Sequence, residues 1–436
     1  PMRIARLLFG TLVVLALAVA GFLLWSSHEE IAEIAASSRP ALDKALVVEG
    51  AQLAAVGNCD VCHTVPGGPA YAGSRPIPTP FGTVYSANIT PDPKTGIASW
   101  SEEAFRRAMR QGVSRQGYNL YPAFPYDHYA KLSDGDIRAL YAFIMTRLPV
   151  ESRPPANALP FPLSLRRVVT IWNLLFLDKA PFDPDPRQTA QWNRGAYLVE
   201  GLGHCGDCHT PRNFLGAEKS GQALAGGVSE GWQAPALNAA SPAPVPWDAQ
   251  HLFSYLHRGW DAEHGAAAGP MQSVTDDLSR VDQQDLHAMA TYLASLQGQI
   301  SAERHQSIDE LLARVNRHEP LAANEHPASL GGILFAGACA DCHAGGPSLV
   351  PPRGIDLALS SAVSAPDPTN AILIILRGIH PGEGQRGPLM PPFGNTFTDG
   401  QIAALLGYVR ENYSDQPAWN NLEARIREIR QGKERS

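Results

Sequence analysis

All six cysteines of this 436-residue chain belong to one motif, in which two cysteines are separated by two residues and followed directly by a histidine. The motif occurs three times, as Cys59, Cys62 and His63, as Cys205, Cys208 and His209, and as Cys339, Cys342 and His343. No cysteine is left over for a disulfide. Two cysteines one helical turn apart can each bond a vinyl carbon of haem, and the next histidine can bind the iron. The motif therefore predicts haem attachment.

A zinc site is the alternative for such clusters. It would need four ligands per metal at set spacing, usually from two pairs. Here each copy of the motif ends in histidine, no fourth partner recurs, and the surrounding segments repeat as well. The sequence therefore predicts three covalently bound haem c groups.

The sixth iron ligand is expected in a loop before the last helix of each copy. Met271, in Gly-Pro-Met, and Met390, in Gly-Pro-Leu-Met-Pro-Pro, are the candidates in the second and third copies. Methionine opposite histidine raises the reduction potential and closes the iron to substrates, which suits electron transfer. The alternative is that each methionine packs in the core.

The first copy departs from this pattern, because its corresponding loop has Phe124 where methionine is expected. Its iron is then either open or bound by another residue. His128, four residues further on, is the candidate, and a second imidazole would lower the potential relative to methionine. A hydrogen-bonding role for His128 is the alternative, since histidine is also a common polar contact.

Helices must position these residues, and the sequence predicts the same set of helices in each copy. A short apolar helix leads into each cysteine motif, and these helices begin near Gly50, Gly195 and Gly332. A proline- and glycine-rich stretch follows, and then a middle helix that ends at Gly112, Gly259 or Gly378. The closing helices are predicted at 134–147, 282–296 and 399–412, with acidic first turns that suit the helix dipole.

This internal repeat of about a hundred residues defines the predicted domain organisation. The segments are a membrane anchor at 1–30, domains at 42–148, 192–298 and 329–414, a linker at 149–191 and a charged helical tail at 415–436. The linker contains an amphipathic stretch, 159–177. It is either a helix packed between two haem domains or an interfacial helix lying on a bilayer.

The net charge and the first residues of the chain indicate which partners and which cellular location to expect. The formal net charge of −7 argues against a nucleic-acid partner, which would need a basic surface. Residues 7–25 are apolar and long enough to span a bilayer, and Arg3 and Arg6 precede them. We therefore expect an inner-membrane protein with its haem domains in the periplasm. A cleaved signal peptide, with a small-residue site at 18–20, is the alternative.

Several long stretches make the chain resemble the tri-haem cytochrome c subunits of bacterial membrane-bound dehydrogenases. These stretches are 76–82, 88–93, 192–205, 208–213 and 365–370. The resemblance implies an all-α fold of three class I cytochrome c domains in tandem with an N-terminal transmembrane helix. It also implies an electron-transfer subunit without catalysis of its own, which accepts electrons from a catalytic subunit and passes them to ubiquinone.

The kind of partner is suggested by the loop from Phe124 to His128. It looks more like that of the cytochrome partners of molybdopterin and iron–sulfur hydroxylases of aldehydes or N-heterocycles. The cytochromes of flavin or PQQ alcohol and gluconate dehydrogenases typically carry methionine there. Alternatives from other classes are a haem peroxidase with an open first haem and an oxidase subunit. No Gly-x-Gly-x-x-Gly follows a predicted strand, so the catalytic cofactor is expected in a partner.

Overall fold

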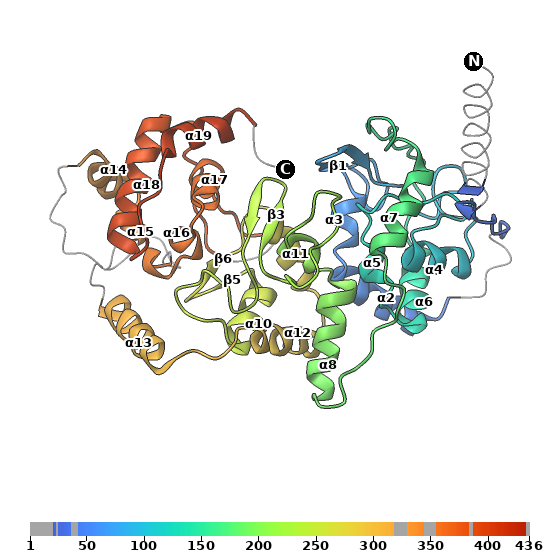
Figure 1. The fold of residues 1–436 in the computed structure, drawn as a ribbon, viewed down its shortest axis with the longest axis horizontal. Coiled ribbons are helices and arrows are strands. Elements are labelled where there is room, and N and C mark those ends of the chain that lie inside the picture. The colour runs from blue at the N-terminus through green and yellow to red at the C-terminus, as the bar shows by residue number, and fades with distance from the viewer. Residues whose placement is uncertain are drawn as a thin grey trace, which may run out of the picture. The chain divides into compact units, whose positions relative to one another are not determined.

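The computed structural model of the chain describes residues 21–22, 25–35, 42–317, 329–343, 355–382 and 387–432. The chain divides into two compact parts, one from 1–54 with 59–183 and the other from 55–58 with 184–436. The first copy of the repeat falls almost entirely in the first part, and the second and third copies fall in the second part (Figure 1).

The elements follow the repeat. The first copy and the linker contain α2 (Lys44–Val56), α3 (Cys59–His63), β1 (Pro76–Thr79), β2 (Gly82–Tyr85), α4 (Glu102–Gln111), α5 (Tyr126–Tyr129), α6 (Asp134–Ile144), the 3-10 helix η2 (Arg166–Val168) and α7 (Val169–Phe176). The second copy contains α8 (Ala190–Tyr197), the π-helical η3 (Leu198–Leu202), α9 (Gly206–His209), β3 (Gly227–Ser229), β4 (Trp232–Ala234), α10 (Ala249–Arg258), β5 (Trp260–Asp261), β6 (Gly265–Ala266), α11 (Pro270–Leu278) and α12 (Gln283–Ser295).

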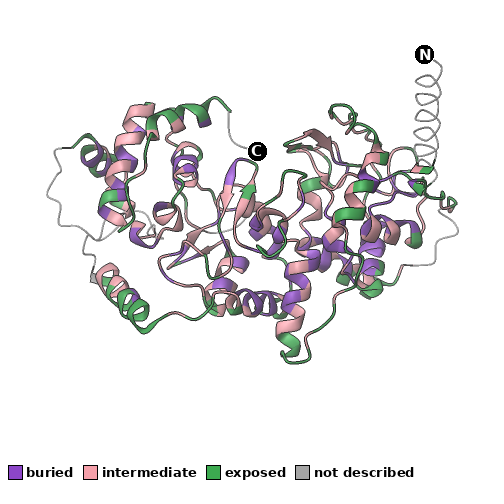
Figure 2. Cartoon of the chain, viewed as in Figure 1, coloured by how far each residue is buried: buried purple, intermediate pink, exposed green. Residues whose placement is uncertain are grey.

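The remaining elements complete the second part. They are α13 (Ala302–Arg317), α14 (Leu330–Ala338), α15 (Ala340–His343), the 3-10 helix η4 (Leu357–Leu359), α16 (Ser361–Ser364), α17 (Thr369–Arg377), α18 (Asp399–Tyr413) and α19 (Leu422–Arg430). Helix α13 is exposed along much of its length, as Figure 2 shows, but Ile308 is buried and packs with Val245 and Leu359. This contact joins α13 to both neighbouring copies.

The predicted all-α class is wrong. Among the described residues, three two-stranded antiparallel sheets lie between the helices, formed by β1–β2, β3–β4 and β5–β6. The strands are short, and β1 reads Pro-Ile-Pro-Thr. Proline within a run argues against a strand, because it is tolerated only at edge positions of sheets. Four residues are also too few for an alternating apolar and polar pattern to mark a strand in the sequence.

The prediction of a transmembrane anchor also needs correction. None of the helices in the described part of the chain is long and apolar enough to cross a membrane. Residues 1–20 and 23–24, which make up most of the predicted anchor, lie outside the described residues. The predicted N-terminal transmembrane helix, and with it the predicted place in the inner membrane with periplasmic haem domains, is therefore withdrawn.

Each copy is closed by its first and last helices, which cross at a glycine. In the second part, α8 lies against α12, and α14 lies against α18 (Figure 1). At each crossing a side chain would collide with a backbone carbonyl of the closing helix, because only glycine lets two helix backbones approach so closely. The pairs are Gly50 with Ala139, Gly195 with Ala288 and Gly331 with Ala404. In the third copy the crossing residue is thus Gly331, next to the Gly332 that the sequence indicated.

The middle helices also end as predicted. Each is followed by a glycine with positive φ, a backbone conformation that glycine adopts without strain. These residues are Gly112 after α4 (φ 60°), Gly259 after α10 (φ 74°) and Gly378 after α17 (φ 74°).

The amphipathic stretch of the linker forms η2 and α7, and it covers the 112–130 loop of the first copy. The Asn119 amide donates to Thr170 Oγ1 at 2.8 Å, and the Tyr126 hydroxyl donates to Asn173 Oδ1 at 2.6 Å. Val169 and Thr170 are buried, whereas other apolar residues of this stretch are exposed. The exposed residues are Phe161, Leu165, Ile171, Leu174 and Leu175. One face of α7 is therefore part of the first copy, and another is open.

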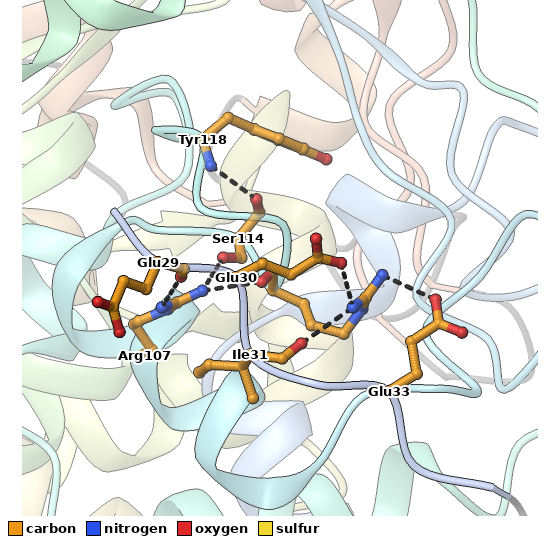
Figure 3. Close-up of polar contacts among 8 residues, drawn as sticks. Glu29, Glu30, Ile31, Glu33, Arg107, Ser114 and Tyr118 are labelled. Carbon is orange, nitrogen blue, oxygen red and sulfur yellow. Dashed lines mark hydrogen bonds and ion pairs between the residues drawn. The ribbon is translucent and has the colours of Figure 1, made fainter. Parts of the chain in front are cut away.

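The segment before the first copy is held on it by two arginines (Figure 3). The Arg115 side chain, only 5% exposed, forms ion pairs of 2.8 Å with Glu30 and with Glu33. Arg107 donates to the backbone carbonyl of Glu29 at 2.7 Å. A buried guanidinium requires such partners, because an unpaired charge is costly away from water. The contacts fix residues 29–33 along the first copy.

Candidate haem sites

The three motif histidines share one hydrogen bond that the sequence did not reveal. In each, the ring Nδ1 lies within hydrogen-bond distance of a backbone carbonyl oxygen. These pairs are His63 with Ala87 at 2.7 Å, His209 with Pro235 at 2.7 Å and His343 with Ile355 at 3.0 Å. A carbonyl can only accept, so Nδ1 carries the proton and Nε2 keeps its lone pair. This is the second contact that usually orients a metal-binding histidine.

The surroundings of these histidines favour the neutral ring. Burial lowers the pKa of His63, His209 and His343 below the ordinary value, although the carbonyl contact opposes the shift. The neutral imidazole is the form that binds a metal. Each ring therefore offers one nitrogen to an iron atom.

The backbone of the first two histidines is fixed in the same way. The carbonyl of His63 accepts a hydrogen bond from Gly73 N, and that of His209 accepts one from Gly226 N, both at 2.7 Å. Both glycines have positive φ, 73° and 93°. The turn that follows each motif thus needs a glycine, because other residues rarely adopt this conformation.

A buried polar network holds the carbonyl that orients His63. Asn88, directly after Ala87, is 3% exposed. Its amide donates to Val150 O at 2.7 Å and to Thr95 Oγ1 at 3.0 Å, and its carbonyl oxygen accepts from Thr90 N at 3.0 Å. The stretch 88–93, one of those that carry the family resemblance, is therefore a support for the first histidine.

The cysteines fit a covalently attached group. None of the six is in a disulfide, and each pair leads into its histidine through a short helix, which begins at Cys59 in the first copy and directly after Cys205 and Cys339 in the other two. Burial raises the pKa of Cys59 and Cys205 to about 12 and that of Cys339 to about 11. The first thiol of each motif thus lies in poorly solvated surroundings, which suit a large apolar ring. Two thiols and one available imidazole nitrogen per turn are the donor set that haem c requires.

The candidate sixth ligand of the second copy does not lie in a loop, as expected, but at the second position of α11. The helix begins after Gly269, which has φ 57°, and Pro270 occupies its first position. Proline suits this position because its fixed φ matches the helix and its missing N–H would have no helical partner. Met271 is half-buried.

The candidate of the third copy lies in an extended segment. Met390 forms an isolated antiparallel bridge with Ile379, with hydrogen bonds from Ile379 N to Met390 O at 2.9 Å and from Met390 N to Ile379 O at 2.8 Å. Its side chain packs against the core of the third copy. Met271 and Met390 as iron ligands both stay predictions.

In the first copy the corresponding residues form an aromatic cluster. The rings of Phe124 and Tyr129 lie 5.4 Å apart, and Tyr126 is fully buried against Trp172 of α7 with 6.1 Å between ring centroids. His128 lies within α5 and is buried. His128 as a ligand of the first iron stays a prediction.

Sequence reasoning missed the three carbonyl acceptors, because their distance from the histidine along the chain differs in each copy. It also missed Trp232, which is 8% exposed and packs in the core of the third copy although it belongs to the second. In the structure, Gly269 has φ 57° and would collide with the Trp232 ring if it carried a side chain, but nothing in the sequence around Trp232 marks this contact.

Two known families match parts of the chain. Residues 47–147 match the family described as cytochrome c, and residues 327–409 match the family described as cytochrome c oxidase, cbb3-type, subunit III. The fold and the donor sets therefore define a cytochrome c with covalently bound haem.

Relatives narrow this class. The chain is 44% identical to a nicotinate dehydrogenase subunit of Pseudomonas putida over 92% of its own length, but it spans only 33% of that protein. It is 34% identical to the fructose dehydrogenase cytochrome subunit of Gluconobacter japonicus, covering 91% of the chain and 84% of the relative. It is 35% identical to the gluconate 2-dehydrogenase cytochrome c subunit of Pantoea cypripedii, covering 85% and 86%. The chain belongs to the family of cytochrome c subunits of dehydrogenases, which serve electron transfer.

Proposed function

We propose that the chain carries three haem c groups and passes electrons from a catalytic dehydrogenase subunit to ubiquinone. The observation that carries the proposal is the hydrogen bond made by each motif histidine. Three times, the imidazole directly after a cysteine pair donates Nδ1–H to a backbone carbonyl. Three separate segments supply these carbonyls, so each copy holds its own ligand.

The residues of the chain have defined roles in this function. The paired thiols Cys59 and Cys62, Cys205 and Cys208, and Cys339 and Cys342 tether the groups, and His63, His209 and His343 offer Nε2. Bound haem iron supplies a one-electron couple. Met271 and Met390 offer thioether sulfurs that would raise the potential and exclude substrates from the metal. His128 is the corresponding candidate in the first copy.

The partner we propose is a molybdopterin hydroxylase with an iron–sulfur subunit that oxidises an N-heterocycle of the nicotinate type. Two observations support it. The relative that is named as part of a nicotinate dehydrogenase shares 44% identity with the chain, against 34% and 35% for the fructose and gluconate relatives. The first copy also has Phe124 in place of methionine. An aldehyde is the alternative substrate of the same class of partner.

Ubiquinone as acceptor is supported by relatives that are named as quinone-dependent alcohol dehydrogenase cytochrome c subunits. The one from Gluconobacter oxydans is 33% identical over 86% of the chain and 80% of its own length. A soluble acceptor would be the competing outcome.

Two measurements test the proposal. The intact mass of the purified protein should exceed that of the polypeptide by three haem groups, and the double variant Cys339→Ala, Cys342→Ala should carry two. When nicotinate is added to the complex isolated with its catalytic subunit, the haem iron should become ferrous, which is measured by absorbance. The ferrous complex should then reduce a short-chain ubiquinone. A mass increase of two haems in the unmodified chain would contradict the count, and reduction by an alcohol or gluconate instead of an N-heterocycle would contradict the partner.

A further inference from the structure

The segments that carry Met271 and Met390 are joined by a hydrogen bond between the second and third copies. Gln272, the residue after Met271, donates its side-chain Nε2–H to the backbone carbonyl of His380. His380 follows Ile379, which is paired with Met390 by two backbone hydrogen bonds. One amide side chain therefore connects the start of α11 to the bridge that holds Met390.

A buried tryptophan closes the same junction. The Trp232 ring, from β4 of the second copy, lies against the backbone of Gly269, two residues before Met271. The ring is also part of the core of the third copy, against whose residues Met390 packs. The Arg377 guanidinium, at the end of α17, lies 5.9 Å from its centroid. An aromatic ring in this position fixes both segments, because a buried tryptophan makes a large number of close contacts.

Further contacts make the junction specific. Next to Trp232, Gln233 N donates to Asn370 Oδ1 at 2.9 Å, and Asn370 Nδ2 donates back to Gln233 O at 2.8 Å. On the other side, the Asp276 carboxylate of α11 lies against the backbone of Gly382. These contacts thus hold the second and third copies in one arrangement next to the segments that carry Met271 and Met390.

We propose that Gln272 is a positioning residue that couples the sixth ligands of the second and third copies. The inference rests on the proposed function, in which Met271 and Met390 bind iron. A shift of one methionine segment is transmitted to the other, because the path between them consists of α11, one side-chain hydrogen bond and a paired backbone bridge. If Met271 and Met390 bind haem iron, the junction would thereby influence the potentials of both haems together.

The test removes the donor and keeps a side chain of similar size. In the haem-loaded chain, Gln272→Leu is compared with Gln297→Leu, since Gln297 makes the same kind of bond to the Leu237 carbonyl within the second copy alone. The readouts are the redox titration resolved by haem and the methionine-to-iron charge-transfer bands. In Gln272→Leu we expect the oxidised-to-reduced ratio at fixed potential to change in both the second and third haems, and the two changes combined should not exceed about fivefold, the worth of one hydrogen bond. Gln297→Leu should change neither.

A second variant, Trp232→Phe, loosens the packing at the junction and leaves Gln272 in place. It should also change the potentials of both the second and the third haem. A change confined to the second haem, or no change in either, would overturn the coupling while leaving the proposed electron transfer intact. If the unmodified chain lacks methionine bands on both haems, then the ligand assignment of the proposed function fails, and the coupling fails with it.

Discussion

The first copy of the repeat differs from the second and third in what holds the segment between the middle helix and the closing helix. In the first copy, this segment is aromatic and is fixed by the linker. Tyr126, fully buried, donates to Asn173 of α7, and the Trp172 ring packs against it. In the second and third copies, the corresponding segments carry methionine and are fixed by each other, through Gln272 and Trp232.

The element that packs on this segment therefore changes together with the candidate ligand that the segment carries. The opening helix, the closing helix and the glycine where they cross are the same in all three copies. What varies is the stretch between the middle and closing helices. The scaffold of the copy is therefore separable from the segment that we propose carries the sixth ligand, and the predictions below test this separation.

The largest effect is expected where methionine would bind iron. Met271→Ala and Met390→Ala should each lower the potential of their own haem by a sizeable part of the roughly 0.8 V range that axial ligands span. Met289→Leu is the matched control, because Met289 is a buried core residue of α12 and should leave all potentials unchanged. Haem-resolved redox titration measures both. An unchanged titration in Met390→Ala would remove it from the ligand set.

The first haem provides the opposite case, since the copy has no methionine to lose at this position. We expect its ferric form to lack the methionine charge-transfer band in the unmodified chain. If His128 binds its iron, His128→Ala should convert this haem alone to a high-spin ferric state, measured by electron paramagnetic resonance. His305→Ala, on exposed α13, is the control. A methionine band on the first haem would contradict the distinction between the copies.

The shared scaffold predicts a stability effect of intermediate size. Gly331→Ala should destabilise the third copy by about 1–3 kcal/mol, because the new methyl group collides with the Ala404 carbonyl. Gly400→Ala, in the first turn of α18, would meet only Glu423 Oε2 at 3.8 Å and should be neutral or stabilise by up to about 1 kcal/mol. Thermal unfolding of the haem-loaded proteins compares the two. Equal effects would mean that the crossing does not require glycine.

The smallest effect concerns the attachment of the linker to the first copy. Tyr126→Phe removes the hydrogen bond to Asn173 and should cost about 1 kcal/mol. It should also increase hydrogen exchange of α7. Tyr118→Phe, at a ring that is 42% exposed, should change neither. If both variants behave alike, the linker is not held by this bond.

The sequence was most informative where a local pattern decides the structure. The closing helices α6, α12 and α18 lie where charged first turns and apolar periodicity predicted them, and Gly112, Gly259 and Gly378 end the middle helices. Both features depend on neighbouring residues only. The strands were missed because they are too short for alternation to show, and Pro76 and Pro78 disguise the first.

The functional geometry was predictable only in part. The cysteine and histidine positions follow from the motif itself, but the carbonyls of Ala87, Pro235 and Ile355 are brought to the histidines by loops of different length. Gln272 and Trp232 owe their roles to a neighbouring copy, and no pattern within their own segment marks such a contact. These contacts depend on packing between segments far apart in the chain, so local sequence patterns could not predict them.

The crossing of the first and last helices also has a kinetic consequence. Each copy is closed by a contact between residues near its two ends, such as Gly195 and Ala288, so the chain must bring distant segments together before the contact stabilises anything. Proteins dominated by such non-local contacts fold slowly. During synthesis, a copy cannot close until its final helix has emerged. The three copies should therefore mature one after another from the N-terminal side, and a stop between α17 and α18 should leave the third copy unclosed and the Met271 segment of the second copy without its contacts to it.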